Sequence, residues 1–185
     1  MRLVLAAAVA ALLSAPVTAH AAPAPATASQ TAVPAWKTYA YRDLHYGADF
    51  PAEPARSEEI VKPGPDQSSL QSTFVVAQLG SSVFGVTTTD YSSATIVPDP
   101  AKLADHALNG VTSERTVMKT SSFEVPGGAG REAVASGGGL VVRVRIYAVN
   151  KRLYIVMAGT LDTAHPHVLD GGDAERFFAS FKPTP

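Results

Sequence analysis

The segment from Leu140 to Thr160 constrains the fold more than any other part of the sequence, because apolar residues alternate with other residues on both sides of one turn signal. Such alternation is typical of antiparallel strands, in which successive side chains point to opposite faces of a sheet. A two-residue turn at Asn150-Lys151 fixes the register of the predicted hairpin and places Tyr147 opposite Tyr154. One face of this hairpin is predicted to carry Val142, Val144, Ile146, Ala148, Leu153, Ile155 and Met157.

Further segments of alternating apolar residues recur along the chain, and Gly, Pro, Asn and Ser separate them at short intervals. Together with the hairpin, they predict strands at residues 42–50, 56–61, 69–79, 83–90, 117–124, 131–136, 140–149 and 152–160. The glycine clusters at 126–131 and 137–139 lack the Lys-Ser/Thr pair of a phosphate-binding loop, and neither begins a helix. They are therefore predicted to be hairpin turns that need positive φ angles.

Two segments change from strand to helical periodicity. In the first, Asp99 precedes Pro100 and an apolar stripe that continues to Val111, which predicts a capped helix over residues 100–113. In the second, Asp173 is predicted to cap a short helix that ends before Pro183 and whose apolar stripe is Ala174, Phe177, Phe178 and Phe181. The predicted fold class is α+β, a single domain in which a twisted antiparallel sheet is flanked by two or three helices.

The first residues of the chain have the pattern of an export signal. Arg2 is followed by an apolar stretch, Leu3 to Leu13, which is too short to cross a bilayer. Ala19-His20-Ala21 is the A-x-A pattern that a signal peptidase accepts. We therefore expect a signal peptide over residues 1–21, cleavage near Ala21, a periplasmic or secreted protein and no transmembrane anchor.

The next segment, residues 22–35, is rich in Ala and Pro and carries no charge. Such a segment cannot bury enough apolar area to offset the entropy of ordering it, so a disordered linker is predicted there. The folded domain is then expected over residues 36–182. Trp36, the only tryptophan, is predicted to anchor its beginning as a packed aromatic residue.

Composition excludes several classes of function. The 185 residues contain no cysteine, which excludes disulfides, thiolate metal sites, iron–sulfur clusters and cysteine nucleophiles. The 15 Lys and Arg side chains nearly balance 16 Asp and Glu side chains, which argues against binding nucleic acid through its phosphates. The G-x-S-x-G and S-x-x-K motifs of serine hydrolases are absent, and no cofactor is expected.

Two histidines before the last predicted helix, His165 and His167, are the candidate metal ligands. Asp162 and Asp170 lie close to them in sequence, and imidazole and carboxylate groups are ligands that zinc and copper prefer. Pro166 stands between the histidines in a predicted loop, so their mutual geometry is undefined. The alternative interpretation is a solvated polar loop.

A second candidate site is a basic and aromatic face of the predicted hairpin, which we call the basic–aromatic patch. By alternation, its side chains point to one side of the sheet, and they are Arg143, Arg145, Tyr147, Arg152 and Tyr154. One interpretation is a binding face for an acidic partner or an anionic ligand. The other is that the arginine stems and tyrosine rings pack under a helix or against neighbouring strands.

Four short motifs, which together extend over most of residues 36–182, resemble a known group of proteins. They are Phe50-Pro51-Ala52-Glu53-Pro54, Gly130-Arg131-Glu132, Arg152-Leu153-Tyr154 and Arg176-Phe177-Phe178-Ala179-Ser180-Phe181. In these motifs the chain resembles exported bacterial proteins of unknown function with a fold similar to that of PsbP and Mog1. The resemblance implies a central antiparallel sheet flanked by helices. It implies no catalytic residues, because PsbP-like proteins act as extrinsic subunits or assembly factors and Mog1-like proteins bind a protein partner.

These observations lead to one expected function and two alternatives. We expect an exported periplasmic, non-enzymatic binding or accessory protein whose partner is an unknown periplasmic protein or small ligand. The first alternative is a small metal-dependent or hydrolytic periplasmic enzyme that uses His165 and His167. The second is a structural cell-envelope protein.

Overall fold

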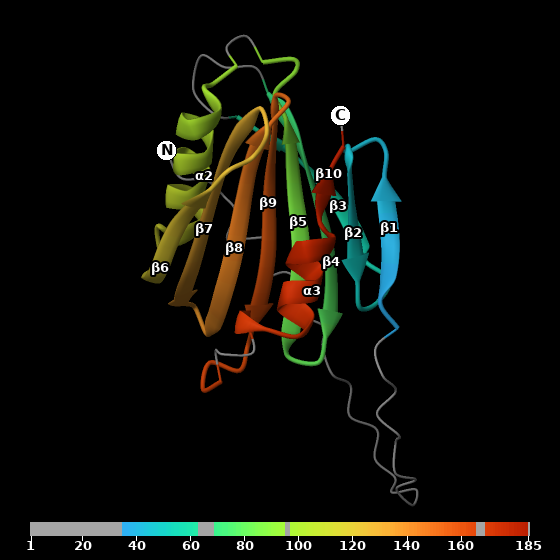
Figure 1. Cartoon of the computed structure of the whole chain (residues 1–185), viewed down its shortest axis with the longest axis vertical. Helices are drawn as coiled ribbons and strands as arrows, with labels where there is room; N and C mark the ends of the chain where they lie inside the picture. Colours follow the sequence, from blue (N-terminus) through green and yellow to red (C-terminus); the bar gives the residue numbers. More distant parts are fainter. Residues whose placement is uncertain (1–34, 63–68, 95–96, 166–168, 185) are drawn as a thin grey trace, which may run out of the picture.

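The computed structural model describes residues 35–62, 69–94, 97–165 and 169–184, and these form antiparallel sheets and two α-helices (Figure 1). The large sheet has seven strands in the order β3-β4-β5-β9-β8-β7-β6. Its strands are β3 (Ala55–Val61), β4 (Leu70–Leu79), β5 (Ser82–Asp90), β6 (Thr116–Phe123), β7 (Gly128–Gly137), β8 (Leu140–Val149) and β9 (Arg152–Thr160). A small sheet has the order β1-β2-β10, with β1 (Lys37–Tyr41), β2 (Tyr46–Phe50) and β10 (Lys182–Pro183). The predicted α+β class with an antiparallel sheet is confirmed.

The predicted hairpin forms β8 and β9, near the middle of the large sheet. Asn150 and Lys151 have φ angles of 51° and 60°, as a two-residue turn between twisted strands requires. Tyr147 therefore lies opposite Tyr154, which confirms the predicted register. The predicted glycine turn at 137–139 is also confirmed, because Gly138 has a φ angle of 62° in the turn between β7 and β8. The predicted turn at 126–131 is right only at its start, where Gly127 has a φ angle of 69°, because β7 already begins at Gly128.

One face of the large sheet is covered by α2 (Pro100–Thr112), which packs mainly on β7 and β8. Its first turn is capped as predicted, since Asp99 Oδ1 accepts hydrogen bonds from the backbone N–H groups of Ala101 and Lys102. The buried face of α2 is Leu103, Ala104, Ala107 and Val111, which pack with most of the predicted apolar face of β8 and β9, namely Val144, Ile146, Ala148, Leu153 and Ile155. This helix ends one residue before the predicted bound.

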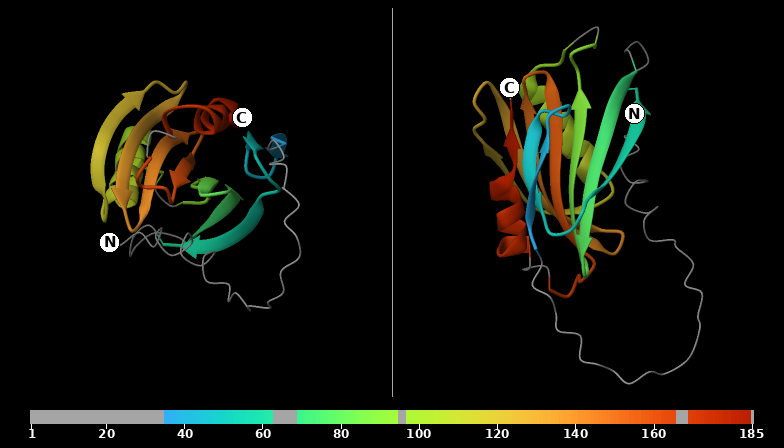
Figure 2. Two further views of the ribbon diagram at one scale, coloured as in Figure 1. Left: turned by 90° about the horizontal axis from the view of Figure 1, so that it is seen from below. Right: turned by 90° about the vertical axis from the view of Figure 1, so that its right-hand side faces the viewer.

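The opposite face is covered by α3 (Asp173–Ser180) and by the small sheet, and Figure 2 places α3 and α2 on opposite sides of the strands. The ring of Phe177 is fully buried, and its centroid lies 5.4 Å from those of both Phe50 and Phe84. The predicted cap is wrong, because Gly172 is the N-cap residue and Asp173 is already helical. Gly172 has a φ angle of 57°, a conformation that glycine adopts without strain, and it leaves Asp173 in the first turn beside the positive end of the helix dipole.

The predicted strand at 42–50 is wrong in its first half. The chain turns there, with the N–H of Leu44 donating to the carbonyl oxygen of Tyr41 and with His45 at a φ angle of 56°. The turn joins β1 to β2, so a strand precedes the predicted one, and the small sheet that they form was not predicted. The alternation of Leu44, Tyr46, Ala48 and Phe50 already begins inside the turn, which hides the end of the turn from a period-two pattern.

Trp36 packs as predicted at the beginning of the folded chain. Its ring meets that of Phe84 edge to face at 5.4 Å, and the guanidinium of Arg176 lies 5.0 Å from the indole centroid. The predicted signal peptide and nearly all of the predicted linker lie outside the described residues. Within the part of the chain that is described, no helix is both long and apolar enough to cross a membrane.

The packing of α3 on the sheet predicts the effect of truncating its central ring. Phe177→Ala should lower the free energy of unfolding by about 3 to 5 kcal/mol, because a buried phenylalanine loses its apolar contacts and leaves a cavity. Urea denaturation followed by circular dichroism measures this change. The exposed Ala179 of the same helix supplies the control, since Ala179→Ser should change stability by less than about 0.5 kcal/mol. Similar losses in both variants would contradict this account of the core.

Candidate functional site

The basic–aromatic patch lies on the face of β8 and β9 that α3 and the small sheet cover. The register of β8 and β9 confirms that its five residues share this face, because residues directly opposite each other point to the same side of a sheet. Tyr147 lies opposite Tyr154, and Val149 lies opposite Arg152. Tyr154 is 1% exposed and Arg143 is 9% exposed. The structure therefore matches the second interpretation of the patch, in which these side chains pack under a helix and against neighbouring strands.

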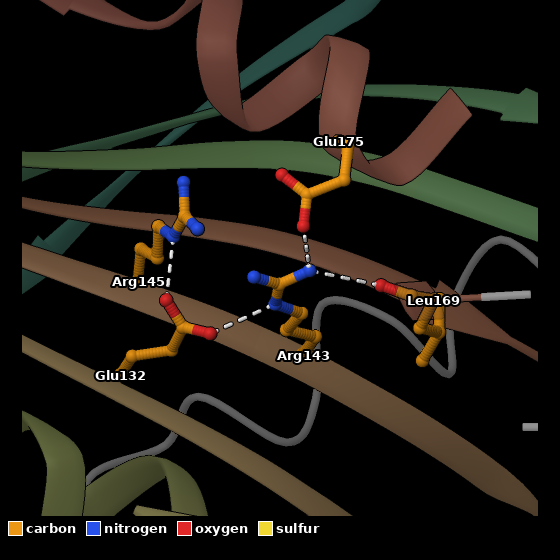
Figure 3. A network of polar contacts seen from close by, with 5 residues as sticks. All are labelled: Glu132, Arg143, Arg145, Leu169 and Glu175. Carbon is orange, nitrogen blue, oxygen red and sulfur yellow. Dashed lines mark hydrogen bonds and ion pairs between the residues drawn. The ribbon is translucent and has the colours of Figure 1, made fainter. Parts of the chain in front are cut away.

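Arg143 lies at the centre of a polar network beneath α3 (Figure 3). Its Nε donates to Glu132 Oε1 at 2.9 Å, and its Nη1 donates to the carbonyl oxygen of Leu169 at 3.1 Å. The same Nη1 donates to Glu175 Oε1 at 2.5 Å, which connects β8 to the first turn of α3. One guanidinium thus binds a neighbouring strand, the segment before α3 and the helix itself.

Arg145 completes this network from the next position on the same face. Its Nε donates to Glu132 Oε2 at 2.6 Å, so Glu132 binds both arginines through its two oxygens. The guanidinium carbons of Arg143 and Arg145 lie 5.1 and 4.8 Å from the ring centroid of Phe178, a distance typical of cation–π contacts. We call Glu132, Arg143, Arg145 and Glu175 the arginine–glutamate cluster. Its two positive and two negative groups balance.

The charges of this cluster change the pKa values of Glu132 and Arg143. Burial opposes ionisation of Glu132, but its hydrogen bonds and proximity to Arg145 and Arg143 outweigh burial and hold its pKa below the ordinary value of 4.5. Burial also opposes the charge of Arg143, whereas Glu175 and Glu132 raise its pKa above its usual value. Glu132 and Arg143 therefore stay ionised at neutral pH, and the hydrogen bond from Arg143 to Glu175 holds α3 on the sheet.

The other patch residues hold different elements together. The Tyr154 hydroxyl lies 3.0 Å from the carbonyl oxygen of His45 and 3.2 Å from that of Leu44, which connects β9 to the turn between β1 and β2. Burial raises the pKa of Tyr154 to about 12, so the hydroxyl remains a donor at physiological pH. Arg152 Nε lies 3.2 Å from Asp90 Oδ2 on the neighbouring β5. Every arginine of the patch thus has a carboxylate partner.

Glu132 and Glu175, as partners of the patch arginines, were missed by sequence reasoning. A signal for Glu132 was present, because a two-residue turn at Gly138-Gly139 places it directly opposite Arg145 on β8. No local signal exists for Glu175, which is 32 positions from Arg143 in the chain. Its contact depends on how α3 packs across the sheet.

The candidate metal ligands are only partly described. His165 is exposed, and its Nδ1 lies 3.0 Å from Asp162 Oδ2. His167 lies outside the described residues, so the pair remains untested. Among the residues that the structure describes, no three or more His, Asp or Glu side chains are grouped so that they could hold a metal ion.

A hollow of about 410 Å³ lies at the beginning of α3, and its lining includes Leu169, whose carbonyl oxygen accepts from Arg143. Phe84, Leu169 and Ala174 form its apolar part, and Asp173 is the ionisable residue among the described residues that line it. The remaining lining residues are Ser82, Gly171 and Gly172. None of the sequence-predicted site residues lies in this lining.

Strand β6 forms one edge of the large sheet and is exposed over most of its length. Its residues Thr116–Ser122 are all exposed, and the apolar side chains of Val117 and Met118 are 45% and 58% exposed. No described strand pairs with the outer side of β6. The sequence predicted a strand at 117–124, but its position at an edge follows only from the strand order.

Neither a scan against protein-family models nor a search of curated proteins finds a match to this chain.

The arginine–glutamate cluster predicts how stability depends on pH. Glu132→Gln should lower the free energy of unfolding at neutral pH by roughly 1.5 to 3 kcal/mol, because hydrogen bonds to charged groups are lost and two guanidiniums lose their shared carboxylate. A carboxyl whose pKa is lower in the folded chain stabilises it above the unfolded value, and this stabilisation disappears as the pH falls through the folded value. The difference between wild type and variant should therefore shrink below pH 4.5.

Urea denaturation at several pH values measures this difference. Glu58→Gln is the matched control, because Glu58 is an exposed carboxylate on β3 that pairs with Arg56 and should contribute less than about 1 kcal/mol. A constant difference between wild type and Glu132→Gln from neutral pH to pH 3 would show that Glu132 does not act through its charge.

Proposed function

We propose that this chain is an exported periplasmic binding or accessory protein without catalytic activity, which acts through an exposed edge of its large sheet. The observation that carries this proposal is β6, an edge strand on which Val117 and Met118 expose 45% and 58% of their surfaces. Exposed strand edges in monomers are usually shortened, charged or covered, because they pair readily with other chains. The eight-residue edge of β6 carries one charged side chain and a bulge at Met118, and the rest of it can pair with a partner.

The basic–aromatic patch supports this proposal by its position inside the molecule. Its three arginines are bound by Glu132, Glu175 and Asp90, so their charges already have partners. A hydrogen-bonded and largely covered cluster of this kind stabilises a rigid scaffold, which a binding protein needs in order to present a fixed surface. We propose that this cluster positions elements rather than binds a ligand directly.

The pattern of the first 21 residues supports export, and the resemblance to PsbP-like and Mog1-like proteins supports binding of a partner. For the enzyme alternative, the described contact is that of His165 Nδ1 with Asp162 Oδ2 at 3.0 Å, and this contact does not favour a second function.

Export can be tested by producing the whole chain in a bacterium with two membranes and fractionating the cells. We expect the protein in the periplasmic fraction with its N-terminus at Ala22, because cleavage follows the A-x-A pattern. Mass spectrometry of the intact protein identifies the N-terminus. Replacing Ala19 and Ala21 by Arg should block cleavage. Retention of Met1 in a cytoplasmic protein would overturn the export part of the proposal.

Partner binding can be tested with immobilised purified protein, envelope extract and chemical crosslinking. We expect a saturable partner that Met118→Lys weakens at least about 5-fold, because the charge would be desolvated in an apolar contact. Ile60→Lys is the matched control, since Ile60 is 66% exposed on β3 at the opposite edge and should leave binding unchanged. Absence of any saturable partner would contradict the proposed function.

A further inference from the structure

We infer that β6 binds an extended peptide segment of a partner protein, which pairs with it as an eighth strand of the large sheet and carries an acidic and an apolar residue four positions apart. This inference rests on the proposed function and adds the chemistry of the partner. It depends on three features of β6: its free backbone edge, its regular second half and the side chains on one of its faces.

The backbone of β6 is available for pairing. Its inner side pairs with β7 from Thr116 to Phe123, and no described strand lies on its outer side (Figure 1). Alternate residues of an edge strand direct their N–H and C=O groups away from the sheet, where only water or another strand satisfies them. A peptide that pairs there gains main-chain hydrogen bonds whatever its sequence, as in β-strand addition.

The regular part of β6 runs from Lys119 to Phe123. The register with β7 shifts between Val117 and Lys119, so that Met118 is an extra residue in a bulge. A bulge bends and twists a strand and disrupts pairing locally. Beyond it, each residue from Lys119 to Phe123 has one partner on β7, from Val134 back to Gly130. These five residues form a continuous template for an added strand.

Side chains on the α3 face of this template set the chemistry of the partner. Lys119 and Phe123 both lie on this face, opposite Val134 and Gly130. Lys119 is exposed and has no ion pair among the described residues. Phe123 is half-buried, lies across Gly130 and meets Tyr147 edge to face at 5.1 Å.

Cross-strand neighbours on one face interact directly. A peptide residue opposite Lys119 is therefore favoured when it is acidic, and one opposite Phe123 when it is apolar. Lys119 and Phe123 are four positions apart, so the two peptide residues are also four apart.

The opposite edge of the large sheet differs in its chemistry. On β3, Arg56 pairs with Glu58 and with Asp43 from the turn between β1 and β2, and Glu59 adds another charge. Charged side chains of this kind oppose the approach of another strand. The structure therefore favours β6 over β3 as the edge that binds the peptide.

The test begins with a display library of random twelve-residue peptides selected on the purified protein. We expect enriched peptides with an Asp or Glu four positions from an aromatic or β-branched residue. Binding of a synthetic enriched peptide is then measured by fluorescence anisotropy for wild type, for Lys119→Glu and for the control Lys102→Glu. Lys102 is exposed on α2 and has no ion pair among the described residues.

Lys119→Glu should weaken binding by about 5-fold, the size expected of one exposed ion pair. A peptide with Lys in place of its acidic residue should regain that affinity on the variant. Methylating the backbone nitrogen of successive peptide residues should weaken binding about 10-fold or more at every second position and little in between, because only alternate N–H groups face β6.

Three outcomes would overturn the inference. They are a library without enriched peptides, enriched peptides whose affinity is the same for wild type and Lys119→Glu, and an N-methylation profile without the two-residue period. Sedimentation that shows a dimer lost in Lys119→Glu would assign β6 to a second copy of the chain instead. A partner captured from envelope extract whose binding is unaffected by Lys119→Glu would leave the proposed function standing while this inference fails.

Discussion

Burial of both faces of β8 and β9 is the constraint on which the rest of the structure depends. One face carries Val144 and Ile146, the other carries Tyr154 and Val156, and all four residues are at most 1% exposed. Helix α2 covers the first face, and α3 and the small sheet cover the second. A helix of eight residues such as α3 is too short to be stable by itself, so its stability comes from packing on this hairpin. The positions of both helices follow from the need to exclude water from two sides of one pair of strands.

Arg143 and Arg145 place positive charges on one of these covered faces, and the carboxylates of the arginine–glutamate cluster compensate those charges. Charged groups removed from water destabilise a fold unless other charges and hydrogen bonds replace the water. Glu132 supplies one oxygen to each of two guanidiniums, and Glu175 and the Leu169 carbonyl satisfy Arg143 further. The cluster thus gives α3 a fixed position on the sheet as well as an apolar contact through Phe178.

Helices α2 and α3 and the small sheet cover the centre of the large sheet, whereas its two edge strands, β3 and β6, are largely exposed. On β3 the edge carries Arg56, Glu58 and Glu59, whereas β6 combines exposed apolar side chains with one lysine. This asymmetry directs our proposals to β6. The basic–aromatic patch, in contrast, lies in the interior, where its side chains contact α3, the small sheet and neighbouring strands.

The sequence by itself determined the β8–β9 register, the turns at Asn150-Lys151 and Gly138-Gly139, and the cap of α2 at Asp99, because each depends on residues within a few positions of one another. Only the tertiary structure decided that Glu175 reaches Arg143, that residues 42–45 form a turn where the start of a strand was predicted, and that β6 lies at an edge. These features depend on strand order and on contacts across long stretches of chain, such as the 109 positions between His45 and Tyr154. Periodicity specifies which face of an element is buried, but not which distant element buries it.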